Sequence, residues 1–140
     1  MRQTLRIIPH RASYMRFLGT VLLLVLVLTA CQETSTLDQA VKLGNQEFSP
    51  QSWAKASQVE RGKMTASFLR KYNATELHRT QIEKLLGHPT GYYYYYNNNP
   101  AYFVGPNTVE SIHGYGYLWV FEASKNDGQI ERVFFVPEIK

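Results

Sequence analysis

The hydrophobic period of this sequence changes at Pro89, and the change limits the possible folds more than any other feature. Before Pro89, "FLRKY" and "HRTQIEKLLGHP" place apolar residues three and four positions apart, as on one face of a helix. After it, runs rich in aromatic and β-branched residues alternate with segments rich in Asn, Gly and Pro, which is typical of strands and turns. Helices followed by strands predict an α+β layer fold.

Two helices are predicted before Pro89. Residues 57–72 form the first, and Trp53 just upstream is expected to pack on it. Residues 78–86 form the second, which ends where Gly87 can adopt a left-handed conformation and Pro89 cannot continue the helix. The apolar faces comprise Met64, Phe68, Leu69 and Tyr72 in the first helix, and Ile82, Leu85 and Leu86 in the second.

The remaining residues predict the sheet. Strands are expected over residues 92–96, 101–106, 114–122 and 129–136, separated by "NNNP" and by a loop containing the turn pair Asp127-Gly128. The whole therefore predicts two N-terminal helices packed on one face of a three- to four-stranded antiparallel sheet. A chain of 140 residues has room for one such domain.

The net charge of +4 belongs to the N-terminal segment. Residues 1–30 hold four of the fifteen Lys and Arg residues and no acid, which leaves eleven basic residues against eleven acidic ones in residues 31–140. A neutral domain lacks the basic surface that attracts a phosphate backbone, so no nucleic-acid partner is expected.

The first thirty residues read as a bacterial signal peptide. Arginines precede the unbroken apolar run "VLLLVLVL" at 21–28, and the longer apolar stretch, residues 17–30, is too short to cross a bilayer comfortably. Because Met15 begins a more typical signal by itself, the true start is expected there as an alternative to Met1.

The only cysteine indicates the type of signal. "LTAC" at 28–31 resembles the lipobox of bacterial lipoproteins, in which a peptidase cuts before the cysteine and its sulfur carries lipid. We therefore expect lipidation at Cys31 and a membrane anchor, because several acyl chains suffice for stable attachment. By the same resemblance, Gln32 in the next position favours the outer membrane, with the domain facing the periplasm.

Residues 31–50 are then expected to form the lipidated cysteine and a flexible tether, although "LDQAVKL" allows a turn of helix. Residues 51–140 are expected to form the folded domain.

The domain resembles the SmpA/OmlA (BamE) group of small outer-membrane lipoproteins, which have a fold like that of the β-lactamase inhibitor proteins. The residues that carry the resemblance are Arg79 to Pro89, "RTQIEKLLGHP", followed by a tyrosine-rich segment and a terminal hairpin. The resemblance covers roughly residues 50–136 and implies a two-layer α/β sandwich in the cell envelope. Residues through which the β-barrel-assembly subunit contacts its partners have no match here, and likeness of fold does not carry function.

Enzymatic chemistry is not expected. The three histidines beyond the signal, His78, His88 and His113, are not spaced as metal ligands, and no nucleophile elbow occurs. Neither a metal nor a cofactor is therefore expected.

Two kinds of binding remain open, namely a protein-interaction or scaffold module and a module that stacks cell-wall glycan on tyrosines. Aromatic residues occur at both parities of the predicted strands, and helices can cover only one face of the sheet. The other face is a candidate interface, unless its tyrosines merely shield the sheet from water. The candidate residues are Tyr92, Tyr93, Tyr94, Tyr95, Tyr96, Tyr115, Tyr117, Trp119 and Phe121.

Overall fold

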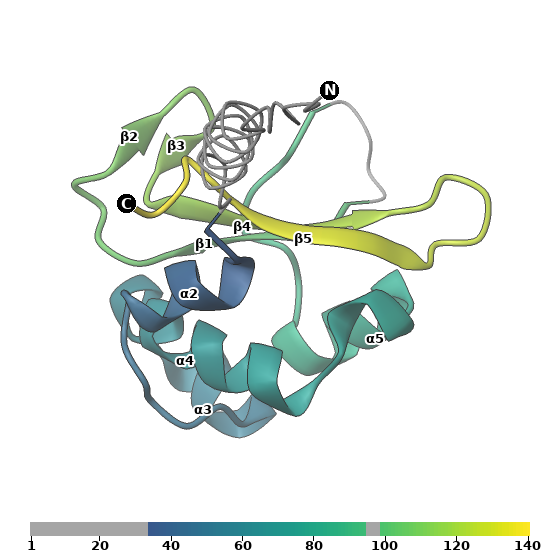
Figure 1. Ribbon diagram of the computed structural model, residues 1–140, viewed down its shortest axis with the longest axis horizontal. Coiled ribbons are helices and arrows are strands. Elements are labelled where there is room, and N and C mark those ends of the chain that lie inside the picture. Colours follow the sequence, from purple (N-terminus) through teal and green to yellow (C-terminus); the bar gives the residue numbers. More distant parts are fainter. Residues whose placement is uncertain (1–33, 95–98) are drawn as a thin grey trace, which may run out of the picture. The chain divides into compact units, whose positions relative to one another are not determined.

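The computed structural model describes residues 34–94 and 99–140, and the helices precede the strands along the chain (Figure 1). The helical elements are α2 (Thr36–Val41), α3 (Pro50–Lys55), α4 (Gln58–Lys71), the 3-10 turn η1 (Ala74–Glu76) and α5 (Arg79–Leu86). The strands are β1 (Ala101–Val104), β2 (Glu110–Ser111), β3 (Gly114–Tyr115), β4 (Tyr117–Ala123) and β5 (Ile130–Val136).

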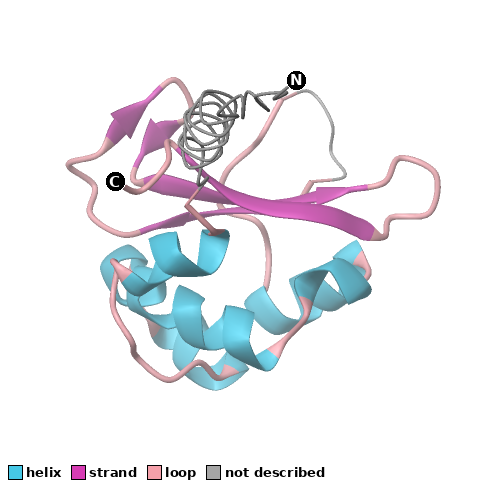
Figure 2. Cartoon of the chain, viewed as in Figure 1, coloured by secondary structure: helices cyan, strands magenta, loops and turns pink. Residues whose placement is uncertain are grey.

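Three of the strands form one antiparallel sheet in the order β1-β4-β5. The register pairs Tyr102 with Trp119, and Trp119 with Phe135. The helices lie together on one side of this sheet, as Figure 2 shows. The α+β class and the antiparallel sheet are therefore confirmed. The short strands β2 and β3 form a separate hairpin.

Both predicted helices are confirmed, and each begins at a capping box. Ser57 accepts a hydrogen bond from the backbone N–H of Glu60, whose carboxylate accepts one from the backbone N–H of Ser57. His78 takes the corresponding position in α5, where its Nδ1 accepts from the N–H of Thr80. Gly87 ends α5 with a φ of 76°, a value that a residue with a side chain rarely adopts.

The predicted tether is wrong from residue 34 onward, because that part of the chain belongs to the folded unit. Gln39 is buried in α2, where its side-chain amide donates to the carbonyl of Thr34 and accepts from the N–H of Ile139. Phe48 is 1% exposed and its N–H donates to the Ser67 hydroxyl. Six-residue helices are too short for periodicity to reveal, although Ser35 and Ser49 cap α2 and α3.

The strand predicted over residues 92–96 is also wrong for the residues that the structure describes. Pairing there is limited to one bridge between Gly91 and Ala101. Tyr94 has a φ of 53°, in the left-handed region that a strand cannot contain. The strand predicted over 114–122 is split at Gly116, whose φ of 108° separates β3 from β4. Tyr95 and Tyr96 lie outside the described residues.

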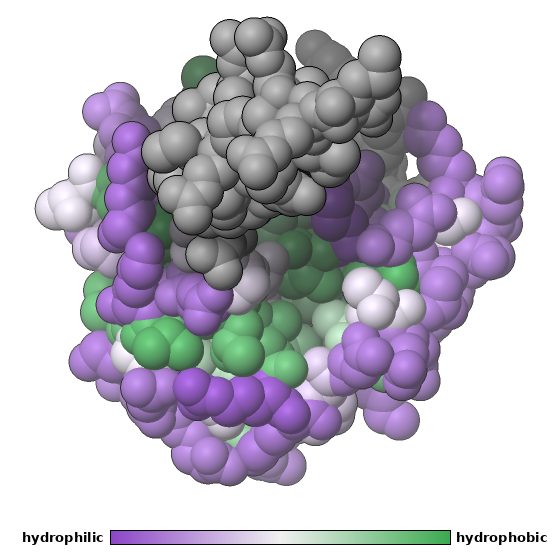
Figure 3. Space-filling view, in the orientation of Figure 1, coloured by the Kyte–Doolittle hydropathy of each residue, from purple (hydrophilic) through white to green (hydrophobic). Residues whose placement is uncertain are grey.

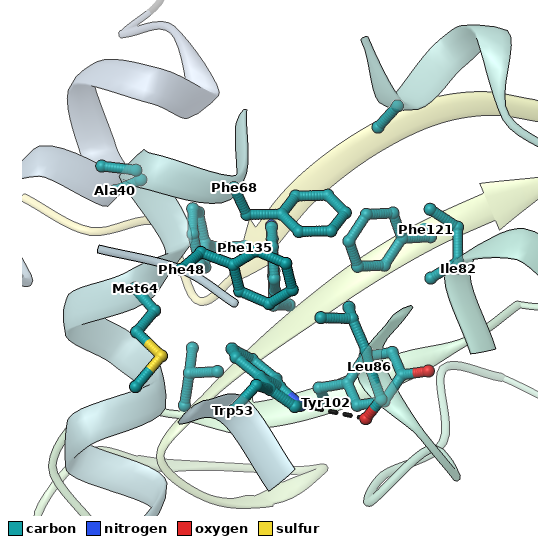
Figure 4. Close-up of a cluster of buried hydrophobic side chains, with 14 of the residues drawn as sticks. Ala40, Phe48, Trp53, Met64, Phe68, Ile82, Leu86, Tyr102, Phe121 and Phe135 are labelled. Atoms are coloured by element: carbon teal, nitrogen blue, oxygen red, sulfur yellow. Dashed lines mark hydrogen bonds between the residues drawn. The ribbon is translucent and has the colours of Figure 1, made fainter. Parts of the chain in front are cut away.

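The main core fills the space between helices and sheet. Trp53 is fully buried there, with the Arg61 guanidinium of α4 5.2 Å from its ring centre, so the predicted packing of Trp53 on this helix is confirmed. Its indole N–H donates to the carbonyl oxygen of Leu86 (Figure 4). Phe68 meets Trp119 edge to face with ring centres 5.2 Å apart. Interlocked aromatic rings thus join α3, α4 and the sheet.

A second, smaller cluster lies on the opposite face of the sheet. Ala101, Leu118 and Val120 are fully buried there, and half-buried side chains pack against them. The half-buried residues are Tyr93, Phe103, Phe134 and Val136.

Candidate functional site

The structure divides the predicted interface residues between the core and the surface. Trp119 and Phe121 are fully buried under the helices, so their assignment to an interface is wrong. Tyr117 is half-buried and packs against the same core. Their shared parity along β4 turns all three toward the helices, while Leu118 and Val120 face the other way.

Part of that other face, which was expected to be a candidate interface, is covered by the chain itself. The ring of Tyr93 meets the ring of Phe134 edge to face, with centres 5.1 Å apart. Gly91 crosses so close that a Cβ atom added there would lie 2.9 Å from the Phe103 ring. Residues 91–94 therefore pass over the face that helices leave open, and Tyr93 completes the second cluster.

Hydrogen bonds to β1 hold this crossing segment in place. The backbone N–H groups of Thr90 and Gly91 both donate to the carbonyl oxygen of Ala101. In return, the N–H of Phe103 donates to the Thr90 hydroxyl at 2.8 Å. The segment thus occupies the free edge of β1 for two residues and then leaves it.

Beyond Gly91 the segment presents aromatic residues to solvent. Tyr92 is 80% exposed and Tyr94 is 59% exposed. The β2–β3 hairpin contributes Ile112 and Tyr115, which are 91% and 62% exposed. We name these four side chains the aromatic rim. Cys31, the proposed lipid acceptor, lies outside the described residues.

His113, in the turn of the β2–β3 hairpin, brings this hairpin beside the crossing segment. Its ring centre lies 5.6 Å from that of Tyr93 and 6.0 Å from that of Tyr94. The Phe103 ring fills the space beneath, because Gly114 leaves room where a Cβ atom would come within 2.8 Å of it. The contacts of His113 therefore bring together two segments about twenty residues apart in sequence.

A cleft of about 300 Å³ opens beside the rim. Its walls come from the crossing segment, from Asn99 just before β1, and from the end of β4, the loop after it and the first half of β5. The residues that line it are Tyr93, Tyr94, Asn99, Glu122, Ala123, Lys125 and Arg132.

An ion pair forms one wall of the cleft. Arg132 lies opposite Glu122 in the β4–β5 register and donates from Nε to its Oε2 at 2.9 Å, with a second bond from Nη2. The guanidinium also lies 4.3 Å from the ring centre of Phe134. The Arg132 side chain is long and has many rotamers, and these contacts fix its orientation.

The other walls are polar but fixed. The side-chain Oδ1 of Asn99 accepts from the N–H of Ala123 at 2.9 Å, so the side-chain NH₂ remains as a donor. Burial is the first cause that raises the pKa of the Tyr93 phenol, followed by the neighbouring phenol of Tyr94. Tyr93 is therefore a neutral phenol at physiological pH.

Two further surface features have structural explanations. A polar hollow surrounds His78, whose Nε2 lies 2.6 Å from the carbonyl oxygen of Asp127 while its Nδ1 caps α5. A hydrogen bond from the N–H of Gln129 leads the causes that lower the pKa of Asp127. This cluster joins the hairpin loop to the start of α5.

An apolar groove runs between α2, the end of α4 and β5, with Leu37, Leu69 and Val133 in its walls. Figure 3 shows apolar atoms gathered over the region of α2 and α4. The hydroxyl of Thr36 donates to the carbonyl of Val133 in this groove and attaches α2 to β5.

Over residues 34–94 and 99–140, no His, Cys, Asp and Glu side chains gather in a group suited to a metal ion. Within the same residues, no helix has the length and apolar character needed to span a bilayer.

Sequence reasoning missed the polar half of the site. Asn99, Glu122, Lys125 and Arg132 were not singled out, because charged and amide residues near turns carry no periodic signal. Only strand register brings Glu122 opposite Arg132. The pattern of opposite charges flanking the turn pair Asp127-Gly128 was the one available sign.

The described unit is thus an α+β domain that carries an exposed aromatic rim beside a small cleft lined by aromatic and polar side chains. No family model matches the chain, and neither a curated protein nor a solved structure matches it. The resemblance to the SmpA/OmlA group therefore stays a prediction from the residues.

Proposed function

We propose that this chain is a bacterial envelope lipoprotein, anchored through Cys31, whose domain binds another envelope protein through the aromatic rim. The observation that carries the proposal is the exposure of Tyr92, Ile112 and Tyr115, at 80%, 91% and 62%. Large apolar side chains so exposed, on two segments that meet at His113, indicate contact with a partner.

The chemistry of the rim suits a protein surface. Tyrosine buries a large ring and keeps a hydroxyl for hydrogen bonding, which is why it is enriched in the centres of protein interfaces. Two aromatic side chains and one aliphatic side chain have the composition of an interface core that is dry when bound.

The rim is also held in a fixed shape. The β2–β3 hairpin is attached to α4 because Gln58 donates from its amide both to the carbonyl of Gly105 and to that of Tyr115, each at 3.1 Å. A surface that is already ordered loses little entropy when it binds, which favours affinity.

The sequence supports the location. A signal segment, the lipobox "LTAC" and Gln32 point to attachment at the outer membrane, facing the periplasm. The resemblance to small outer-membrane lipoproteins agrees with a scaffold role. Neither enzymatic activity nor a metal, cofactor or nucleic-acid partner is expected.

Site-specific cross-linking tests this proposal. A photoreactive residue at position 115 should give a discrete cross-linked product in intact cells, and Tyr92→Ser together with Ile112→Ser should remove it. The matched control is position 84, because Lys84 is exposed on α5, in the helical layer on the opposite side of the sheet from residues 91–94. Equal yields of the same product from positions 115 and 84 would contradict an interface at the rim.

A further inference from the structure

The cleft beside the rim has the size of a site for one small ring. Its volume of about 300 Å³ lies at the lower end of the range for ligand pockets, which begins at about 300 Å³. It is therefore large enough for a single sugar ring. Its lining combines aromatic rings with a few polar groups, which is the usual composition of such sites.

Tyr94 supplies a flat apolar wall. Its ring is 59% exposed and meets the Tyr93 ring edge to face, with centres 4.5 Å apart. Tyr93 is in turn held by Phe134 at 5.1 Å. One face of a pyranose ring carries only C–H groups, and such a face packs well on an aromatic ring because both are apolar.

The polar wall offers hydrogen-bond donors in excess. Of the five N–H donors of an arginine, Arg132 gives two bonds to Glu122, and the others have no partner among the described residues. Asn99 adds its amide NH₂, since its oxygen is taken by Ala123. The Oε1 atom of Glu122 is a free acceptor in the described part of the chain.

The charges that line the cleft favour the same kind of ligand. Two cationic side chains, Arg132 and Lys125, line the cleft with one carboxylate, Glu122. A ligand that matches this wall has at least one hydroxyl for Glu122 and one acceptor group for the guanidinium and amide. Acetamido and carboxylate groups both provide such an acceptor.

The backbone at Tyr94 is an independent observation. Its φ of 53° lies in the left-handed region, which is unfavourable for a tyrosine. Residues held in such conformations cluster at binding sites, where the strain places a side chain that a relaxed backbone would turn elsewhere. Here the conformation belongs to an exposed ring that lines the cleft.

From these observations we infer that the cleft binds a pyranose ring carrying an acetamido or carboxylate group, the chemistry of bacterial cell-wall glycan. The inference goes beyond the proposed function, since it assigns Tyr94 and Arg132 to a saccharide and leaves Tyr92, Ile112 and Tyr115 to a protein. A domain with both surfaces would connect an envelope protein to the cell wall.

The test is to titrate sugars into the full-length protein in detergent micelles and to monitor binding by NMR. The probes are N-acetylglucosamine, N-acetylmuramic acid and glucose. We expect the first two to bind and glucose to bind about tenfold more weakly, because glucose lacks the acceptor group. N-acetylmuramic acid carries both groups, so its comparison with N-acetylglucosamine shows whether the carboxylate contributes.

Variants locate the binding. Tyr94→Gly suits the left-handed backbone and removes the ring, so it should keep the fold and weaken binding about tenfold or more, the effect of losing one stacking platform. Arg132→Gln should weaken binding to a similar extent. Tyr92→Ala is the matched control, because Tyr92 is 80% exposed and does not line the cleft.

Several outcomes would overturn the inference. These are glucose binding as tightly as N-acetylglucosamine, an unchanged affinity in Tyr94→Gly, an equal loss in Tyr92→Ala, or no response to any of the three sugars. If no sugar responds while Tyr94→Gly loses the cross-linked product described for position 115, the cleft belongs to the protein interface. If the photoreactive residue at position 115 gives no discrete product in the otherwise unaltered protein while sugar binding is intact, only the protein-interaction proposal is overturned.

Discussion

Trp53 donates its indole N–H to the carbonyl oxygen of Leu86 at 2.9 Å, which ties α3 to the last residue of α5. Both side chains are buried, with Trp53 at 0% and Leu86 at 3% exposure. The bond satisfies one of the carbonyls that a helix leaves unpaired at its C-terminal end. The C-terminal end of α5 is therefore also a packing contact between α5 and α3.

The first prediction separates the adjacent leucines of α5. Leu86→Ala should lower the free energy of unfolding by about 2–5 kcal/mol, because it leaves a cavity in the main core. Leu85→Ala should cost less, because Leu85 is only half-buried against that core. Urea denaturation of the full-length protein measures both. Equal losses would show that the two side chains are packed alike.

The second prediction concerns neighbouring tyrosines. Tyr93→Ser should lower the melting temperature, because Tyr93 packs on Phe134 and completes the second cluster. Tyr92→Ser should leave the melting temperature nearly unchanged, since Tyr92 is 80% exposed and substitutions at such positions change stability by only about 0.5 kcal/mol. Thermal unfolding followed by circular dichroism distinguishes them, and a larger loss in Tyr92→Ser would reverse the assignment.

The third prediction concerns alkaline pH. Burial is the main cause that raises the pKa of Tyr102 above its ordinary value of 10.0, and its hydroxyl donates to the carbonyl of Gly87. The folded protein keeps this proton at pH values where the unfolded chain has lost it. The contribution of Tyr102 to the free energy of unfolding should therefore be complete below pH 10 and should fall as the pH rises above 10.

Tyr102→Phe provides the measurement. Below pH 10 the variant should be less stable by about 0.5–1.5 kcal/mol, the net value of one hydrogen bond. Above pH 10 the difference should shrink, because only the wild type must keep a phenol protonated at this position. A constant difference in urea midpoint across pH 10 would contradict the buried, neutral phenol.

The fourth prediction concerns processing. Cys31→Ser should prevent acylation and leave an uncleaved precursor, because the thiol accepts the lipid. Labelling with radioactive palmitate measures it, and label on the serine variant would refute Cys31 as the acceptor. A chain beginning at Met15 should be exported and lipidated as well as the full reading frame. Retention in the cytoplasm would show that residues 1–14 are needed.

The sequence by itself determined the elements with strong local signals. Residues 57–72 and 78–86 were predicted as helices and are observed as α4 and α5, because amphipathic spacing, a capping serine and a terminating glycine act within one or two turns. The strands at 101–104 and 130–136 followed from their aromatic and β-branched residues. The α+β class needed nothing more than the order of these elements.

Only the tertiary structure decided which faces are covered and where the cleft lies. The five consecutive tyrosines favour a strand by local preference, yet Tyr94 is left-handed and Tyr93 packs across the sheet on Phe134. Parity in β4 was readable from sequence, but the choice of Trp119 for the core required the helices to be placed. Glu122 and Arg132 meet only through strand register, a property that the nine intervening residues do not reveal.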